Sequence, residues 1–333
     1  MIAVLIAGSG FSGCERPPNV VKLSGETMGT TYHVTVVDPP RNSTSAIEEA
    51  IIAALARVNQ QLNNWDPQSE VSTFNQREST EPLPVSDAFQ AVMAQSFDIH
   101  RQSDGRFDVT LAPLIELWGF GPRTPDSPVP GEAAISTALS RVGMARLLTL
   151  DGGNLTKANP KTSVNLAAIA KGYGVDQIAG ALDALGISNY LVEIGGDLIT
   201  AGTNQDGGPW RVGIETPDRV GRSIHYIIRL SNVGMATSGD YRNFVEHEGK
   251  RYSHILDPVT GRPVEHRLAS VTVLHETAAL ADGWATALLV LGDKAGMTLA
   301  DTLGIAAYFI VRGEDDFEVL RSERFNALVP KPD

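Results

Sequence analysis

Short β-rich runs with few helices between them dominate the second half of the chain. Apolar alternation predicts strands at residues 190–194, 198–201, 211–215, 225–230, 270–274, 305–311 and 317–320. A doubly wound parallel sheet needs a helix between successive strands, and this order does not supply one. We therefore expect an α+β fold, with mixed or antiparallel sheets packed with helices. A chain of 333 residues can form this as a single unit.

Helical periodicity is clearest in the first half of the chain. Ser45 and Glu48 have the spacing of a capping box, and apolar residues then recur every three or four positions up to Leu62. Further helices are expected at residues 86–103, 133–141 and 170–185, with a strand at 31–37 and a hairpin formed by 147–150 and 154–158.

Charge and cysteine content exclude several classes of protein. The formal net charge is −12, with no run of Lys or Arg to offset it, so nucleic acid is not an expected partner. A single cysteine, Cys14, rules out an internal disulfide framework and a Cys-rich zinc site.

The amino terminus has the pattern of an exported protein. A short apolar run and a small-residue stretch precede Cys14, and Ser12-Gly13-Cys14 resembles a bacterial lipobox. We expect residues 1–13 to be a signal peptide, Cys14 to carry lipid, and residues 14–22 to form a tether. The alternative is a disordered tail with a lone cysteine.

The same segment also spells a dinucleotide-binding fingerprint, Gly8-x-Gly10-x-x-Gly13. That fingerprint requires a helix to begin at its last glycine, and Pro17 and Pro18 follow almost at once. We reject the Rossmann interpretation on this ground.

The apolar segment 278–291 contains two oxygen-bearing side chains in helical register. Asp282 and Thr286 are four residues apart and lie on one face of a helix. Burying a carboxylate there requires a cation, and Mg²⁺ prefers oxygen ligands. The alternative is that Asp282 faces solvent and Thr286 bonds back to its own helix.

Two further segments are candidates for binding phosphate and moving a proton. Lys171 stands in the first turn of a helix that follows a small-residue turn, a pattern that suits a phosphate but is also common in plain packing. His254 lies near Asp257, so it is a candidate general base, although an isolated histidine is more often structural. Gly195-Gly196 marks a tight turn where backbone can approach a ligand, and the alternative for the next residue, Asp197, is that it caps that turn.

Taken in order, these motifs resemble the ApbE family of FAD:protein FMN transferases. The resemblance covers residues 26–292. It rests on the segments 27–32 (TMGTTY), 69–75 (SEVSTFN), 105–114 (GRFDVTLAPL), 117–121 (LWGFG), 168–173 (AIAKGY), 194–197 (IGGD), 238–242 (SGDYR), 254–261 (HILDPVTG) and 281–286 (ADGWAT).

The resemblance implies a set of site residues and a T-fold-related domain at residues 23–328. Mg²⁺ would be held by Asp282, Thr286 and the carbonyl of Ala168. His254 would be the catalytic base with Lys171 at the phosphates, and Asp257 would be the alternative base. The residues implied to bind FAD are Met28, Trp65, Arg106, Phe107, Asp108, Lys171, Gly195, Gly196, Asp197, Ser238 and His254. Where the family often has Asp-Leu-Gly-Gly, this chain has Asn165-Leu166-Ala167-Ala168, which removes one charge near the metal.

The resemblance also implies an activity and a place. FMN would pass from FAD to a Thr or Ser hydroxyl of an acceptor protein as a phosphoester, releasing AMP, on the periplasmic side of the bacterial inner membrane. The sequence leaves open the acceptor, the oligomeric state, and whether K⁺ or a second Mg²⁺ assists. Two alternatives remain at this point: an FAD pyrophosphatase that releases FMN and AMP, and a flavin-binding lipoprotein without turnover.

Overall fold

A computed structural model describes residues 17–121, 129–217, 223–241, 244–314 and 316–330. The expected signal peptide, the Gly8–Gly13 pattern and the lipidation of Cys14 lie outside the described residues. Among the helices of the described ranges, none is both long enough and apolar enough to span a membrane.

An eight-stranded antiparallel sheet forms the centre of the molecule, in the order β1-β2-β6-β7-β10-β15-β16-β17. These strands are β1 (Val20–Thr27), β2 (Thr30–Val37), β6 (Tyr190–Ile194), β7 (Asp197–Ala201), β10 (Val233–Gly239), β15 (Leu268–His275), β16 (Ala306–Arg312) and β17 (Phe317–Arg321). The first two are joined by a two-residue turn in which Met28 and Gly29 have φ of 50° and 74°, as a tight hairpin requires.

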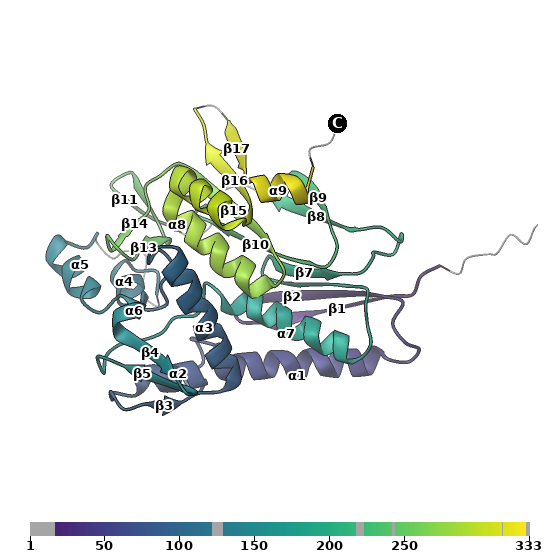
Figure 1. The fold of residues 1–333 in the computed structure, drawn as a ribbon, viewed down its shortest axis with the longest axis horizontal. Coiled ribbons are helices and arrows are strands. Elements are labelled where there is room, and N and C mark those ends of the chain that lie inside the picture. The colour runs from purple at the N-terminus through teal and green to yellow at the C-terminus, as the bar shows by residue number, and fades with distance from the viewer. Residues whose placement is uncertain (1–16, 122–128, 218–222, 242–243, 315, 331–333) are drawn as a thin grey trace, which may run out of the picture.

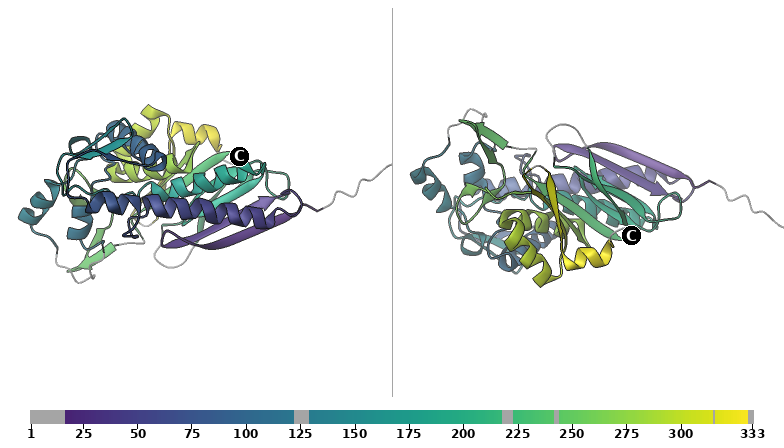
Figure 2. Two further views of the ribbon diagram at one scale, coloured as in Figure 1. Left: turned by 90° about the horizontal axis from the view of Figure 1, so that it is seen from below. Right: turned by 90° about the horizontal axis from the view of Figure 1, so that it is seen from above.

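Three helices cover one face of this sheet: α1 (Thr44–Leu62), α7 (Ala170–Ala184) and α8 (Ala278–Leu303). The view from below shows α1 running along the face of the molecule that these helices form (Figure 2, left). The N–H of Leu280 donates to the hydroxyl of Thr277, which caps the start of α8. Gly292, with φ of 81°, interrupts α8, so its two parts meet at a kink.

The other face of the sheet carries a two-stranded ribbon and a short helix. The ribbon is β8 (Trp210–Glu215) with β9 (Ile224–Leu230), and the helix is α9 (Glu323–Leu328). Val212 and Ile228 of the ribbon share a hydrophobic cluster with Leu198 and Met235 of the large sheet. The ribbon therefore packs on the large sheet rather than extending it.

The remaining elements lie together at the end of the molecule opposite the one where β1 begins (Figure 1). A three-stranded sheet has the order β3-β5-β4, and two short hairpins pair β11 with β12 and β13 with β14. These elements are β3 (Leu83–Pro84), β4 (Leu148–Asp151), β5 (Asn154–Lys157), β11 (Phe244–His247), β12 (Lys250–Ser253), β13 (Leu256–Asp257), β14 (Arg262–Pro263), α2 (Glu70–Gln76), α3 (Asp87–Gln102), α4 (Ala112–Leu117), α5 (Glu132–Leu139) and α6 (Met144–Leu147).

The structure confirms the α+β class and most of the predicted elements, and it corrects two local predictions. Ser45 is not a capping residue: α1 is preceded by Ser43 without a side-chain cap, and the Ser45 hydroxyl bonds Glu49 instead. The expected tether is too long, because residues 20–22 are already part of β1, where they pair with β2.

Candidate active site

The carboxylate of Asp282 is buried in the first turns of α8. Its residue is 4% exposed, which excludes the solvent-facing alternative. Thr286 lies one turn later, and its hydroxyl is 3.1 Å from that of Ser238 on β10. Apolar neighbours bury this face of α8 against β10 and β15, so the two oxygen-bearing side chains are held between helix and sheet.

The start of α7 meets Asp282 from the opposite side. The Gly172 N–H is 3.3 Å from Oδ2 of Asp282, and the Lys171 ammonium is 3.6 Å from the same oxygen. Lys171 also forms a short ion pair with Asp197, a residue that is 2% exposed. Asp197 therefore does not cap its own turn; there the Gly196 N–H donates to Glu193 at 2.5 Å.

This buried cluster has more negative than positive charge. Burial and then the neighbouring Asp282 carboxylate raise the pKa of Asp197, although Lys171 acts against this. Burial alone would lower the pKa of Lys171, but Asp197 and Asp282 outweigh it and raise that pKa. Two carboxylates share one ammonium, and the contacts to Asp282 are longer than a good charge-assisted hydrogen bond. A divalent cation with oxygen ligands fits this imbalance.

Asp176, on α7, caps the first turn of α8. Its two carboxylate oxygens accept the N–H groups of Ala278 and Ala279 at 2.8 and 2.9 Å. One turn earlier on α7, Gly172 lies against the backbone of the same two alanines, and an added Cβ would be 2.7 Å from Cα of Ala279. The starts of α7 and α8 thus pack in direct contact next to Asp282, and this contact is called the interlock of the two helices.

Asp176 gives a prediction about pH. Burial, which outweighs the two N–H donors, raises the pKa of Asp176 from 3.8 to about 6. A raised pKa in the folded state means that its contribution to stability is complete below pH 4 and is lost as the pH rises through about 6. We compare the unfolding free energy of the wild type with that of Asp176→Asn, both in EDTA. The wild-type value minus the variant value should therefore fall by up to about 3 kcal/mol between pH 4 and 7. Denaturant titrations at each pH measure this difference, and a difference that rises with pH contradicts the assignment.

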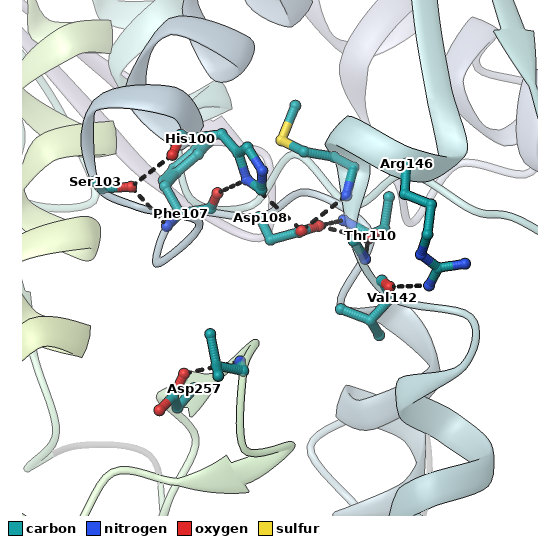
Figure 3. A network of polar contacts seen from close by, with 11 residues as sticks. His100, Ser103, Phe107, Asp108, Thr110, Val142, Arg146 and Asp257 are labelled. Carbon is teal, nitrogen blue, oxygen red and sulfur yellow. Dashed lines mark hydrogen bonds and ion pairs between the residues drawn. The ribbon is translucent and has the colours of Figure 1, made fainter.

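The loop before α4 is fixed by a buried carboxylate, Asp108 (Figure 3). One oxygen of Asp108 accepts the N–H and hydroxyl of Thr110 at 2.7 and 2.5 Å, and the other accepts the Met144 N–H at 2.8 Å. The Nδ1 atom of His100 lies 2.7 Å from the Phe107 carbonyl oxygen. Both oxygens of Asp108 accept protein donors, which fixes the loop that carries Arg106 and Phe107, and contact of Asp108 with FAD stays a prediction.

Arg106 connects this loop to the segment that carries His254. Its guanidinium bonds Asp257 at 2.7 Å, and the other Asp257 oxygen accepts the Val259 N–H. His254 stands two residues before β13, with its ring centroid 6.3 Å from that of Phe120. The structure thus pairs Asp257 with Arg106.

A cavity of about 690 Å³ brings most of the predicted site together. The predicted residues that line it are Arg106, Phe107, Asp108, Ala168, Lys171, Gly195, Gly196, Ser238, His254, Asp282 and Thr286. Asn165 also lines it, and Asp197 lies behind Lys171. Within the described residues no cluster of three His, Cys, Asp or Glu side chains could hold a metal, so a cation here would need hydroxyl, carbonyl or substrate oxygens as well.

Three predicted FAD contacts are not among the residues that line the cavity: Asp197, which lies behind Lys171, Met28 and Trp65. Met28 packs beside Gly174 of α7, partly buried against the core. Trp65 is 68% exposed, so its ring is not packed into the core. Its loop is held to the segment before α7, because the Leu166 N–H donates to the side-chain amide oxygen (Oδ1) of Asn64 at 2.8 Å. Contact of Met28 and Trp65 with FAD stays a prediction.

Sequence reasoning missed the interlock of Asp176 and the pairing of Arg106 with Asp257. Asp176 stands within the Lys171 segment, five residues after the lysine, but nothing local indicates that it caps a helix 102 residues away. Arg106 and Asp257 are 151 residues apart, and an alignment showing paired change would have been the signal.

Known proteins resemble this chain over nearly its whole length. The ApbE family model matches residues 28–309. An FAD:protein FMN transferase of Vibrio cholerae serotype O1 is 42% identical over 322 residues, covering 96% of this chain and 96% of that protein. One of Haemophilus influenzae is 40% identical over 336 residues, covering 98% and 96%. The solved structure of the flavin transferase ApbE from Vibrio cholerae matches with a TM-score of 0.87 at 40% identity, covering 94% of this chain and 100% of that one.

Proposed function

The chain belongs to the ApbE family and moves FMN from FAD to a target protein, and from this premise we propose that it uses Mg²⁺ and attaches FMN to a Thr or Ser hydroxyl. The hydroxyl oxygen attacks the FMN phosphorus, the pyrophosphate bond breaks, and AMP leaves. The product is a phosphoester between FMN and the acceptor. The observation that carries this proposal is the cavity in which Lys171, Asp282, Thr286 and His254 meet.

The proposed roles follow from charge and position. Asp282, Thr286 and the Ala168 carbonyl would hold Mg²⁺, which when bound neutralises negative charge on phosphate oxygens. Lys171 is oriented by Asp197 and contributes a fixed positive charge at the same place. Arg106 lines the cavity with its guanidinium held by Asp257, which supports a role in placing the FAD phosphates.

His254 is the proposed base for the acceptor hydroxyl. Its side chain lines the cavity, and an imidazole can accept a proton near neutral pH. Asp257 is engaged with Arg106 and Val259, which favours His254 for this role.

Replacing His254 by Ala should lower the turnover number for FMN transfer by about 10²-fold or more, because a positioned base contributes on that scale. FAD affinity, measured by titration, should change far less than turnover. His247→Ala is the control, since that histidine is partly exposed on the β11–β12 hairpin and does not line the cavity. Equal turnover in the two variants would remove His254 from the reaction.

Mass spectrometry of a Thr-containing acceptor domain tests the function itself. With the enzyme, FAD and Mg²⁺, the domain should gain the mass of one FMN phosphoester, and with EDTA it should not. Free FMN and AMP without an adduct would indicate a pyrophosphatase. Intact FAD would indicate a binding protein without turnover.

We also propose that lipid on Cys14 holds the protein at the periplasmic side of the inner membrane. The support is the Ser12-Gly13-Cys14 pattern after an apolar run. Expressed with its full leader, the protein should sediment with membranes and the Cys14→Ser variant should not. Equal membrane association of both would refute lipidation at this residue.

A further inference from the structure

The central sheet has an unpaired stretch of strand edge beside the candidate active site. Strand β7 pairs with β10 through Val233, Gly234 and Met235. Beyond Met235, β10 continues to Gly239 along β15, but β7 does not continue beside it. The pairing stops at Met235: Gly196, which the same register would bring opposite Thr237, belongs to the β6–β7 turn, and its N–H bonds the Glu193 side chain instead.

The direction of the hydrogen bonds along β10 shows which main-chain groups have no neighbouring strand. The Asp240 N–H donates to the Ala269 carbonyl at 3.1 Å, toward β15. Alternate residues of a strand point to the same edge, so Ser238 also bonds toward β15, while Thr237 and Gly239 point the other way. In agreement, the hydroxyls of Thr237 and Thr272 are 2.8 Å apart, as in a non-hydrogen-bonded pair.

Within the ranges that the structure describes, the main-chain N–H and C=O of Thr237 and Gly239 have no hydrogen-bond partner. Both residues line the cavity. Both residues are partly exposed, and unpaired main-chain groups along a strand edge are a template for pairing with another chain. A ligand with alternating donors and acceptors would satisfy them.

The cavity reaches both faces of the sheet at this gap. On the face covered by helices it is lined by Ser238, Asp282 and Lys171. On the face covered by the β8–β9 ribbon it is lined by apolar Leu198 and Met235 and by the carboxylates of Glu193 and Glu215. His33 also lines the cavity and pairs with Glu193 at 2.8 Å, but the described residues that line this half include no lysine, so it suits a phosphate less well than the half that holds Lys171.

We propose that an extended segment of the acceptor protein adds to the sheet as a strand along Thr237 and Gly239. It enters from the face covered by the β8–β9 ribbon and pairs with β10 at the usual strand spacing of about 4.8 Å. Its reacting hydroxyl then lies next to Ser238, between Lys171 and His254. The proposal rests on the proposed function, because transfer to a protein hydroxyl requires a peptide to reach this point.

The test removes the unpaired N–H of Thr237 and leaves the ladder to β15 intact, and Thr237→Val is compared with it because the proline variant also loses the hydroxyl that meets Thr272. Thr237→Pro eliminates an N–H that bonds nothing in the free enzyme, a position where proline is tolerated in a strand. The KM for the acceptor domain that the wild type flavinylates should rise at least tenfold, while FAD affinity measured by titration stays within twofold. An unchanged KM would overturn the proposal.

A matched control lies at the outer edge of the same sheet. The Ser322 N–H donates to Ala307 of β16, so the odd-numbered residues of β17, including Val319, point their N–H groups away from β16. Val319→Pro thus removes an equivalent unpaired N–H far from the cavity. It should leave the KM for the acceptor unchanged, and an equal rise in both variants would count against the proposal.

Hydrogen exchange tests the wild type without relying on the folding of a variant. The acceptor domain with its reacting Thr replaced by Val serves as an unreactive ligand. It should slow amide exchange in residues 233–239 beyond any effect of FAD, and no added protection would overturn the proposal. Absence of FMN transfer by the wild type would instead refute the hydroxyl chemistry of the proposed function, so the two failures are distinguishable.

Discussion

Asp282→Asn should reduce FMN transfer by about 10³-fold, the scale of losing a group that fixes charge stabilisation at a phosphoryl centre. The amide keeps the shape of the side chain but removes the negative charge that a cation needs. Because the carboxylate is buried beside Asp197, removing its charge also relieves repulsion. We therefore expect the unfolding temperature of the apoprotein to stay equal or to rise, while transfer is lost.

The measurement is the rate of FMN adduct formation against Mg²⁺ concentration, together with calorimetric titration of Mg²⁺. Asp98→Asn is the control, because that carboxylate is exposed on α3 and pairs with Arg101. Wild-type rates with an unshifted Mg²⁺ dependence in Asp282→Asn would exclude the carboxylate as a metal ligand.

Gly172→Ala should destabilise the protein by about 3 kcal/mol or more, because its new methyl group would overlap the backbone of Ala278. Backbone cannot rotate aside as a side chain can, so α7 and α8 must separate. Separation would also break the contact of the Gly172 N–H with Asp282. Denaturant and thermal unfolding, with FMN transfer on the same samples, measure both effects.

Gly180→Ala is a matched control on the same helix. A Cβ at Gly180 meets nothing within 4 Å, so this substitution should stabilise the protein by about 0.5–1 kcal/mol through better helix propensity. If both alanine variants behave alike, helix propensity rather than the close approach of the two helices governs position 172.

Local patterns were sufficient where an element is self-contained. Periodicity and capping predicted α3, where the hydroxyl of Ser86 accepts the Phe89 N–H, and predicted that Asp282 and Thr286 share one helix. They did not reveal whether Asp282 is buried, because its burial depends on contact with α7 more than a hundred residues away. Most of the candidate site was therefore predictable as a list of residues but not as an arrangement.

The elements that the sequence missed are held by tertiary contacts. Strand β10, with the sequence VGMATSG, is rich in small residues of low β propensity and is fixed by pairing with β7 and β15. Strand β1 alternates adequately, but its place directly after the expected tether concealed it. The prediction of helix α1 was correct, but that of its capping residue was wrong, because Ser45 lies inside the helix and its hydroxyl bonds the Glu49 carboxylate.

The contact between α7 and α8 has a consequence for the order in which the chain folds. Asp176 and its partner Ala278 are 102 residues apart, so a folding chain has only one wall of the site until the later helix has docked. Closing such long loops is slow compared with forming a helix. When the unfolded chain is refolded, FAD cleavage should consequently return late and all at once, and a chain truncated before residue 286 should be inactive however well its first half is folded.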